Sequence, residues 1–403
     1  MEQLIQQLRE WRYSWIQGWR TFESRLPPWW TRALAGALIA FGILFPFLFS
    51  QGSGFLNATI TALAYSVMAL GLNVVVGFAG LLDLGYVAFY AIGAYCAGWF
   101  GSEFFFNRHI HILSSPVAGK LIGIHLNFVF ILVIAVILTA FFGAIIGLPT
   151  LRLRGDYIAI VTLAFGEIID RIAINGQSIH LGGGTTLTGG SIGISALDPI
   201  YIPGIGTFDQ LHLRPWYWVI FAILMLVLFV NVRMRDSRLG RAWVALREDE
   251  VAAVSMGIPL VKTKLMAYAI GAAFGGMSGV FLATFQTVVS SDRFSFSFSI
   301  FILSMVIVGG LGSVWGVLLG ALLLSYINQY LIPDVLNSIP SSLGLSFSLT
   351  DIGLGIYGFL LVLVMVLRPQ GLIPERRRKL ELAKGIGVGE TELGMAAGEG
   401  TEA

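Results

Sequence analysis

The sequence contains very little cysteine and little charge. Its 403 residues include a single cysteine, Cys96, which excludes a disulfide framework and a cysteine-rich zinc site. Charged residues make up 12% of the chain, whereas soluble domains average about 25%. The net charge of +2 gives no reason to expect a nucleic-acid partner. These low values argue against a secreted, disulfide-bonded or ordinary soluble protein.

Motifs for nucleotide or metal chemistry are also missing. Gly119-Lys120 is followed by Leu121, and Ser114 stands where a phosphate-binding loop would begin with glycine, so no such loop is predicted. The sequence has no His-Glu-x-x-His motif, and no metal or cofactor is expected in this chain. Ser191 fits the letters of Gly-x-Ser-x-Gly, but it lies in a glycine-rich loop rather than between a strand and a helix. The sequence therefore does not predict an enzyme.

Long apolar runs dominate what is present. Hydrophobic residues make up 56% of the chain, and the mean hydropathy is +0.81. A membrane-spanning helix needs about 20 apolar residues. We therefore predict an all-α polytopic membrane protein with about ten spans, some of them broken. The expected spans lie near 33–50, 55–77, 82–100, 127–148, 157–174, 216–232, 263–288, 299–312, 314–332 and 351–367.

Lysine and arginine are unevenly distributed between the connecting loops. They concentrate in loops 149–156 and 232–262 and in the tail after the last span, which predicts that these segments and both termini are cytoplasmic. Loops 101–126 and 175–215 are poorer in positive charge for their length and are expected on the opposite side.

Three regions are expected along the chain: an amphipathic cytoplasmic arm at 1–32, a permease domain at 33–379 and a disordered tail at 380–403. The arm repeats Leu and Trp at helical spacing. It therefore fits a helix lying in the membrane interface, or an ordinary helix packed before the first span.

Glycine interrupts two apolar segments at corresponding places in the two halves of the chain. Such interruptions point to broken helices near a substrate route, although small residues also serve close helix packing. The candidate route residues from these stretches are Gly77, Gly80, Asp83, Gly309, Gly310 and Gly312.

Glu167 is a further candidate, because it lies about 16 Å along a helix that starts near Asp156. Charges at this depth are usually paired or functional. Arg171 follows four residues later. Glu167 therefore either pairs with Arg171 or lines the transport path.

A charged amphipathic segment, "GRAWVALREDEVAAVSMGI" at 240–258, separates two apolar runs. It is too polar to span the membrane, and we predict a cytoplasmic helix that couples the permease to a separate motor. Small residues would permit close docking, charges would fix orientation, and a glycine would end the helix. The predicted coupling residues are Arg247, Glu248, Glu250, Ala252, Ala253 and Gly257.

This segment resembles the coupling segment of binding-protein-dependent ABC importers, although Val251 stands where those have an acidic residue, with Glu250 one position early. Five further stretches together resemble the LivM-type permease of the branched-chain amino-acid ABC transporter family. They are "GLLDLGYVAFYAIGAY", "LRGDYIAIVTLAFGEI", "LTGGSIGI", "GGLGSVWGVLLGA" and "LRPQGLIPERRR".

The resemblance implies an importer in the bacterial plasma (inner) membrane. Its other subunits would be a second, LivH-like permease, two ABC ATPases that bind ATP and Mg²⁺, and a periplasmic or lipid-anchored solute-binding protein. The substrate would be a branched-chain or other neutral amino acid. The same machinery importing urea or amides, and a secondary transporter or channel acting alone, remain open alternatives.

Overall fold

The computed structural model describes residues 30–115, 118–150, 153, 157–182, 184–202, 204, 206–209, 211–336, 353–368 and 371–373. The chain divides into two compact units, Met1–Ser50 and Gln51–Ala403. The first contains α2 (Trp30–Leu44) and the short η1 (Phe45–Leu48). Residues 1–29 of the expected arm and the whole of the expected tail, 380–403, lie outside the described residues.

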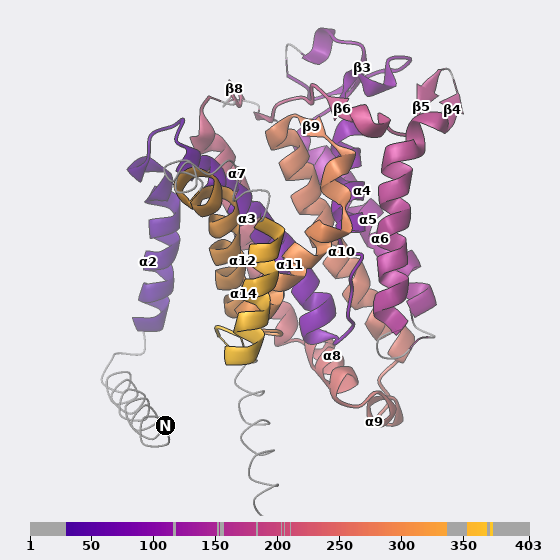
Figure 1. The fold of residues 1–403 in the computed structure, drawn as a ribbon. Coiled ribbons are helices and arrows are strands. Elements are labelled where there is room, and N and C mark those ends of the chain that lie inside the picture. Colours follow the sequence, from indigo (N-terminus) through magenta and orange to yellow (C-terminus); the bar gives the residue numbers. More distant parts are fainter. Residues whose placement is uncertain are drawn as a thin grey trace, which may run out of the picture. The chain divides into compact units, whose positions relative to one another are not determined.

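The second unit is a bundle of helices, shown in Figure 1. Each expected span from 55–77 onward overlaps a helix of this unit, as 33–50 overlaps α2 in the first. The helices are α3 (Gly54–Leu72) continued by the π-helical η2 (Asn73–Phe78), α4 (Val87–Phe100), α5 (Phe128–Thr150), α6 (Tyr157–Asn175), α7 (Leu213–Arg235), α10 (Leu260–Gln286), α11 (Phe296–Gly309), α12 (Val314–Tyr326) continued by the π-helical η8 (Ile327–Leu336), and α14 (Gly353–Leu367).

Within the described part of the chain, five helices are long and apolar enough to cross a membrane. They are Gly54–Phe78, Phe128–Thr150, Leu213–Arg235, Leu260–Gln286 and Val314–Pro333. Shorter apolar helices include Val87–Phe100 and Phe296–Gly309. The prediction of a mostly helical, polytopic membrane protein is confirmed.

Helix α10 lies at the centre of the unit and packs against α3, α4 and α5. Glycines make these contacts close: a Cβ at Gly93 of α4 would lie 2.6 Å from the Cα of Gly276 in α10. Lipid offers no hydrophobic drive for helix association, so small residues that let backbones approach are favoured at such interfaces.

Helix α5 shows the opposite, outward-facing pattern. Val129, Val133, Ile137 and Phe141 are four residues apart and 51–65% exposed. Residues at this spacing share one face of a helix. That face is suited to lipid or to another membrane subunit.

The fold departs from an all-α protein at one end of the bundle, where Figure 1 shows the short strands gathered. The strands are β1 (Gly101–Ser102), β2 (His109–Ile112), β3 (Gly123–Leu126), β4 (His180–Gly182), β5 (Thr185–Thr186), β6 (Ile194–Ser195), β7 (Tyr201–Ile202), β8 (Gly206–Thr207) and β9 (Val288–Val289). They form one sheet in the order β1-β3-β2 and the pairs β4-β5, β6-β9 and β7-β8. In the sheet, β3 pairs antiparallel with β1 and parallel with β2.

Short single-turn 3₁₀ helices lie between these strands and the spans: η3 (Glu103–Phe105), η4 (Ala118–Lys120), η5 (Gly176–Ser178), η6 (Gly190–Ile192) and η7 (Ser291–Phe294). Helices α8 (Arg238–Glu248) and α9 (Glu250–Ser255) lie at the opposite end of the bundle (Figure 1). Loops 101–126 and 175–215 therefore lie together, away from the charged 240–258 segment, as the loop charges predicted.

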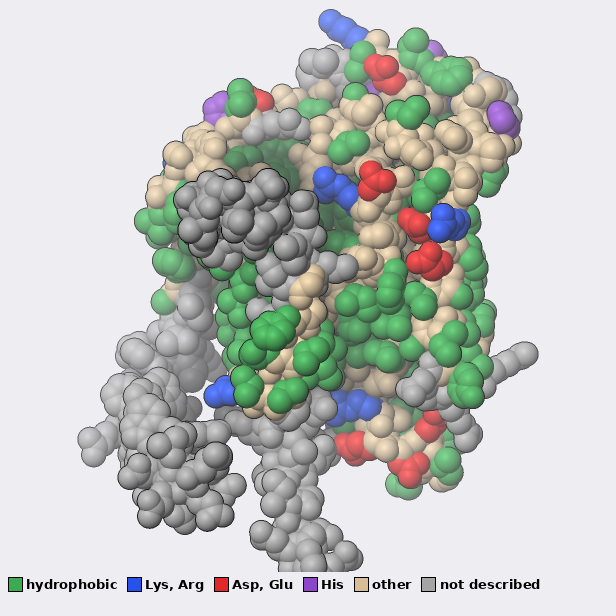
Figure 2. Space-filling view, in the orientation of Figure 1, with side chains coloured by type: hydrophobic (Ala, Val, Ile, Leu, Met, Phe, Trp, Pro, Cys, Tyr) green, Lys and Arg blue, Asp and Glu red, His purple; other side chains and the backbone are tan. Residues whose placement is uncertain are grey.

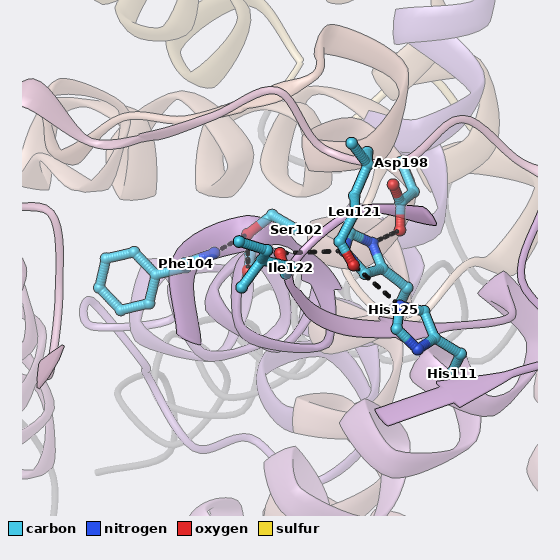
Figure 3. A network of polar contacts seen from close by, with 8 residues as sticks. Ser102, Phe104, His111, Leu121, Ile122, His125 and Asp198 are labelled. Carbon is cyan, nitrogen blue, oxygen red and sulfur yellow. Dashed lines mark hydrogen bonds and ion pairs between the residues drawn. The ribbon is translucent and has the colours of Figure 1, made fainter. Parts of the chain in front are cut away.

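A buried polar contact joins two of the strand-bearing loops. His125 on β3 is fully buried, and its Nδ1 lies 2.6 Å from Asp198 Oδ2. Figure 3 shows the His125 ring between this carboxylate and the ring of His111, on which it stacks at 5.3 Å. Burial raises the pKa of Asp198, and the hydrogen bond from His125 partly offsets that rise. The contact fixes the loop at 198 to the sheet.

Candidate functional site

The charged segment forms two short helices rather than the single helix that was predicted. Helix α8 begins after Ser237, whose side chain accepts from the backbone N–H of Gly240, and it ends at Glu248. Asp249 has extended backbone angles and caps α9 by accepting from the N–H groups of Val251 and Ala252 at 2.9 and 3.0 Å. An aspartate in this position satisfies N–H groups that the new helix leaves free. The aspartate cap therefore divides the segment.

Gly257 ends α9 as predicted. Its φ is +85°, and the N–H of Ile258 donates to the carbonyl of Ala253. This is the left-handed helix stop that glycine allows without strain.

Two of the predicted coupling residues face inward rather than outward. Ala253 is buried, at 4% exposure, so its side chain is not on the surface. Glu250 forms an ion pair with Lys264 of α10, with Nζ to Oε1 at 2.7 Å. Lys264 is buried, and a buried ammonium needs such a partner. The ion pair attaches α9 to α10.

The outer surface of α9 and its C-terminal turn is apolar. Val251, Val254 and Met256 are 66%, 47% and 84% exposed. Of the predicted residues, Ala252 and Gly257 are exposed here, and Glu248 is exposed at the end of α8. This exposed group, Val251, Val254 and Met256, is called the α9 tip below.

Arg247 connects α8 to the first glycine interruption. Its Nη1 donates to the carbonyl of Gly77 at 2.6 Å, and a Cβ at Gly80 would overlap its side chain. Trp243, one turn earlier, is fully buried and stacks on Phe78. Its indole N–H donates to Thr263 O at 2.8 Å. Helix α8 is thus held against the end of η2.

The two glycine interruptions meet inside the unit. Asn73 Oδ1 accepts from the N–H of Gly312 at 2.9 Å, and a Cβ at Gly77 would lie 2.6 Å from the same nitrogen. Segments more than 230 residues apart are thereby hydrogen-bonded. A continuous chain of contacts runs from Arg247 through Gly77 and Asn73 to Gly312.

The second interruption is also tied to the chain after α14. The N–H of Leu372 donates to Val308 O at 2.9 Å, and the N–H of Ile373 donates to Gly309 O at 3.1 Å. These bonds satisfy carbonyls at the end of α11, where the helix supplies no partner. Gly310 lies against the backbone of Gly371. Gly371, Leu372 and Ile373 therefore have a local structural role that the sequence analysis did not anticipate.

Asp83 lies in a non-helical stretch before α4, which begins at Val87 rather than near residue 82. Its side chain is buried, and Oδ1 accepts from the N–H of Gly85 at 2.9 Å. The other carboxyl oxygen has no partner among the described residues. A Cβ at Gly85 would overlap the backbone of Thr162 in α6, so this stretch is pressed against α6. Asp83 positions the start of α4.

Glu167 does not form the ion pair with Arg171 that was one of the two predicted alternatives. The ion pairs among the described residues do not include it. Glu167 and Arg171 instead line a surface groove of about 360 Å³ with Ile168 and Ile172. Of the predicted route residues, Gly77, Gly309, Gly310, Gly312 and Asp83 are buried inside the unit, whereas Gly80 is exposed and Glu167 is partly exposed beside the groove.

Among the described residues, the site consists of packing contacts, hydrogen bonds and one ion pair between helices. No cluster of three or more His, Cys, Asp or Glu residues that could hold a metal ion occurs in the part of the chain that was searched, the described residues. Sequence reasoning missed Asn73, Trp243 and Lys264. In the sequence, Asn73 is a lone amide in an apolar run, Trp243 lies between Arg241 and Arg247, and Lys264 follows Lys262 at the start of an apolar run.

Comparison with known proteins identifies the family. The profile of the family described as "Branched-chain amino acid transport system / permease component" matches residues 54–365. The chain is 38% identical over 378 residues to the high-affinity branched-chain amino acid transport system permease protein LivM of Escherichia coli, covering 88% of this chain and 77% of that protein.

The Salmonella typhimurium LivM is 36% identical over 374 residues, with the same coverage. A probable LivM of Methanocaldococcus jannaschii is 27% identical, covering 77% of this chain and 91% of the relative. No solved structure matches the chain significantly. The chain therefore belongs to the family of permease components of branched-chain amino acid transport systems.

Proposed function

We propose that this chain is one of two membrane subunits of an ATP-driven, binding-protein-dependent importer of branched-chain or other neutral amino acids. It would lie in the bacterial inner membrane with about ten spans, both termini and the α8–α9 segment being cytoplasmic. As a permease component it moves solute and is not an enzyme. Its energy would come from ATP and Mg²⁺ bound by separate ATPase subunits.

The observation that carries this proposal is the contact between α8 and the glycine interruptions. Arg247 bonds Gly77, and Asn73 bonds Gly312. A force applied to α8 would therefore act directly on both interruptions. Packed elements of this kind move between discrete arrangements rather than deforming continuously. This is the arrangement that an external motor requires.

The α9 tip supports docking of a motor protein. Its three large apolar side chains are 47–84% exposed, on an element that the loop charges predict to be cytoplasmic. The ion pair between Glu250 and Lys264 attaches α9, which carries the tip, to α10. We propose that the tip, with Arg247, Glu248, Ala252 and Gly257 beside it, fits a cleft of an ABC ATPase.

The remaining proposed partners are a second, LivH-like permease and a periplasmic or lipid-anchored solute-binding protein. An amino acid carries two charges, and passage through lipid would leave both unsatisfied. The route is therefore proposed between the two permeases. Gly77, Gly80, Gly309, Gly310 and Gly312 would act as its joint, and Asp83 would position the adjoining start of α4.

Glu167 would border the same route from the outward groove on α6. If it does, Glu167→Gln should slow uptake, and adding Arg171→Met should not restore it. Rescue by the second substitution would instead mean that the two side chains pair in the working complex.

Reconstitution tests the proposal as a whole. The chain alone in liposomes should move no labelled leucine, with or without ATP. Adding the second permease, both ATPases, the binding protein and ATP should start uptake. Leucine flux through the single chain, driven by a proton or sodium gradient, would refute the importer and favour a secondary transporter. Uptake of labelled urea or a short amide in place of leucine would support the same ABC importer with a different substrate.

Docking is tested separately at the α9 tip. The double substitution Val254→Asp and Met256→Asp should prevent the ATPases from co-purifying with the permeases, because two desolvated carboxylates would be unpaired in the cleft. Ile192→Asp is the matched control, since Ile192 is 88% exposed on η6 at the strand-bearing end. Normal co-purification of the α9 variant would show that the ATPases bind elsewhere.

A further inference from the structure

A cavity of about 280 Å³ lies between the helices, outside the contacts described so far. Figure 2 shows a recess with hydrophobic walls in the upper half of this face, beside basic and acidic side chains. Small-molecule pockets begin at about 300 Å³, so the cavity is of the size that a small ligand fills. Its lining comes from α3, α4, η7, α11, η8 and the start of α14, and it includes Tyr65, Tyr90, Asp292, Arg293, Ser297 and Phe298.

One part of the lining carries opposite charges that are not paired. Asp292 and Arg293 are adjacent on η7, and both are exposed to the cavity side of the unit. The ion pairs among the described residues include neither of them. Arg293 lines the cavity together with the hydroxyl-bearing side chains of Tyr65 and Tyr90. An exposed arginine and an adjacent exposed aspartate that line the same cavity can bind the two oppositely charged groups of one small ligand.

The other part of the lining is aromatic and fixed by ring contacts. Tyr65 packs edge-on against Phe298 and Phe301, with centroids 5.3 and 6.0 Å apart. Tyr90 contacts Phe298 at 5.4 Å. Tyr65, Tyr90 and Phe301 are buried. The cavity therefore offers a rigid apolar wall next to a positive and a negative group.

We propose that this cavity binds the amino acid in transit. Arg293 takes the α-carboxylate through its fork of N–H donors, which matches a carboxylate in geometry. Asp292 takes the α-ammonium, and Phe298 contacts the apolar side chain. The first turn of α11 adds partial positive charge on the carboxylate side. The assignment rests on the proposed importer function, since it gives that function's cargo a site in this chain.

The complete reconstituted complex, with labelled leucine and ATP, tests the assignment. Arg293→Met keeps the length of the side chain and removes its charge. We expect the uptake rate at saturating leucine-loaded binding protein to fall about 10- to 100-fold, the effect of losing one charge-assisted contact. Arg293→Lys should retain part of the rate. Arg108→Met is the control, because Arg108 is exposed in the 101–126 loop and lines none of the cavities described.

A second measurement does not depend on the folding of the arginine variant. Ser297 is exposed and lines the cavity, so Ser297→Cys should react with a polar thiol reagent in the assembled complex. Leucine with binding protein and ATP should slow that reaction. The native Cys96 is buried and provides the background.

The outcomes separate the two proposals. Absence of ATP-dependent leucine uptake by the wild-type complex would overturn the importer function and the cavity assignment with it. Uptake by the wild type, together with an unchanged rate in Arg293→Met, would overturn the cavity assignment alone. So would a Ser297→Cys reaction that leucine does not slow, with uptake intact.

Discussion

Gly77→Ala tests the contact between the two glycine interruptions. A methyl group at position 77 would overlap Asn73 Oδ1 and lie 2.6 Å from the nitrogen of Gly312. The 2.9 Å hydrogen bond between those two groups could then persist only if one backbone moved. The carbonyl of Gly77 also accepts from Arg247, so the same movement reaches α8.

Two costs set the size of the effect. Leaving a buried N–H without its acceptor costs about 1–3 kcal/mol, and forcing an extra carbon into a packed interior costs about 1–3 kcal/mol. Together these predict a loss of about 2–6 kcal/mol if nothing relaxes. That is a large part of the about 5–15 kcal/mol by which proteins are stable.

The assay compares melting temperature in detergent with leucine uptake per assembled complex. Gly36→Ala is the control, because Gly36 lies within α2 with nothing within 4 Å of an added Cβ. Alanine there should be neutral or slightly stabilising. Gly77→Ala should lower both the melting temperature and uptake. Wild-type values for both would refute the argument that these backbones are in contact and coupled.

Two further predictions concern buried charges at opposite ends of the bundle. Glu250→Gln leaves Lys264, whose side chain is 7% exposed, without its carboxylate partner, and it should lower the free energy of unfolding by up to about 3–5 kcal/mol. Adding Lys264→Met should recover the stability lost, as measured by an unfolding titration in detergent. Equal instability of the single and double variants would contradict this prediction. For Asp198, burial raises the pKa above its ordinary value of 3.8, so stability is lost as pH rises through the folded pKa. His125→Gln removes the contact that partly lowers this pKa, so its melting temperature should fall with rising pH over a wider range than that of the wild type. Adding Asp198→Asn should abolish this difference in pH dependence. Identical pH profiles of the wild type and His125→Gln would contradict the prediction.

The sequence by itself determined the features that depend on local pattern. Apolar runs predicted the bounds of helices such as α5 and α10 to within a few residues. A segment of about 20 apolar residues crosses the lipid as a helix, because a helix satisfies its own backbone hydrogen bonds there. The stop at Gly257 followed from the backbone angles that glycine permits. Quoted motifs also identified the family, which the comparisons confirm.

Only the tertiary structure decided which residues meet through space. Asp249 reads as one more charge in a helix, yet its side chain caps α9 and divides the segment. The sequence predicts Ala253 as a docking residue, but its side chain is buried. The bond between Asn73 and Gly312 and the gathering of Tyr65, Arg293 and Phe298 around one cavity depend on how helices cross. Periodicity gives the face of one helix and does not specify its neighbour, because the same small-residue or aromatic face fits several partners.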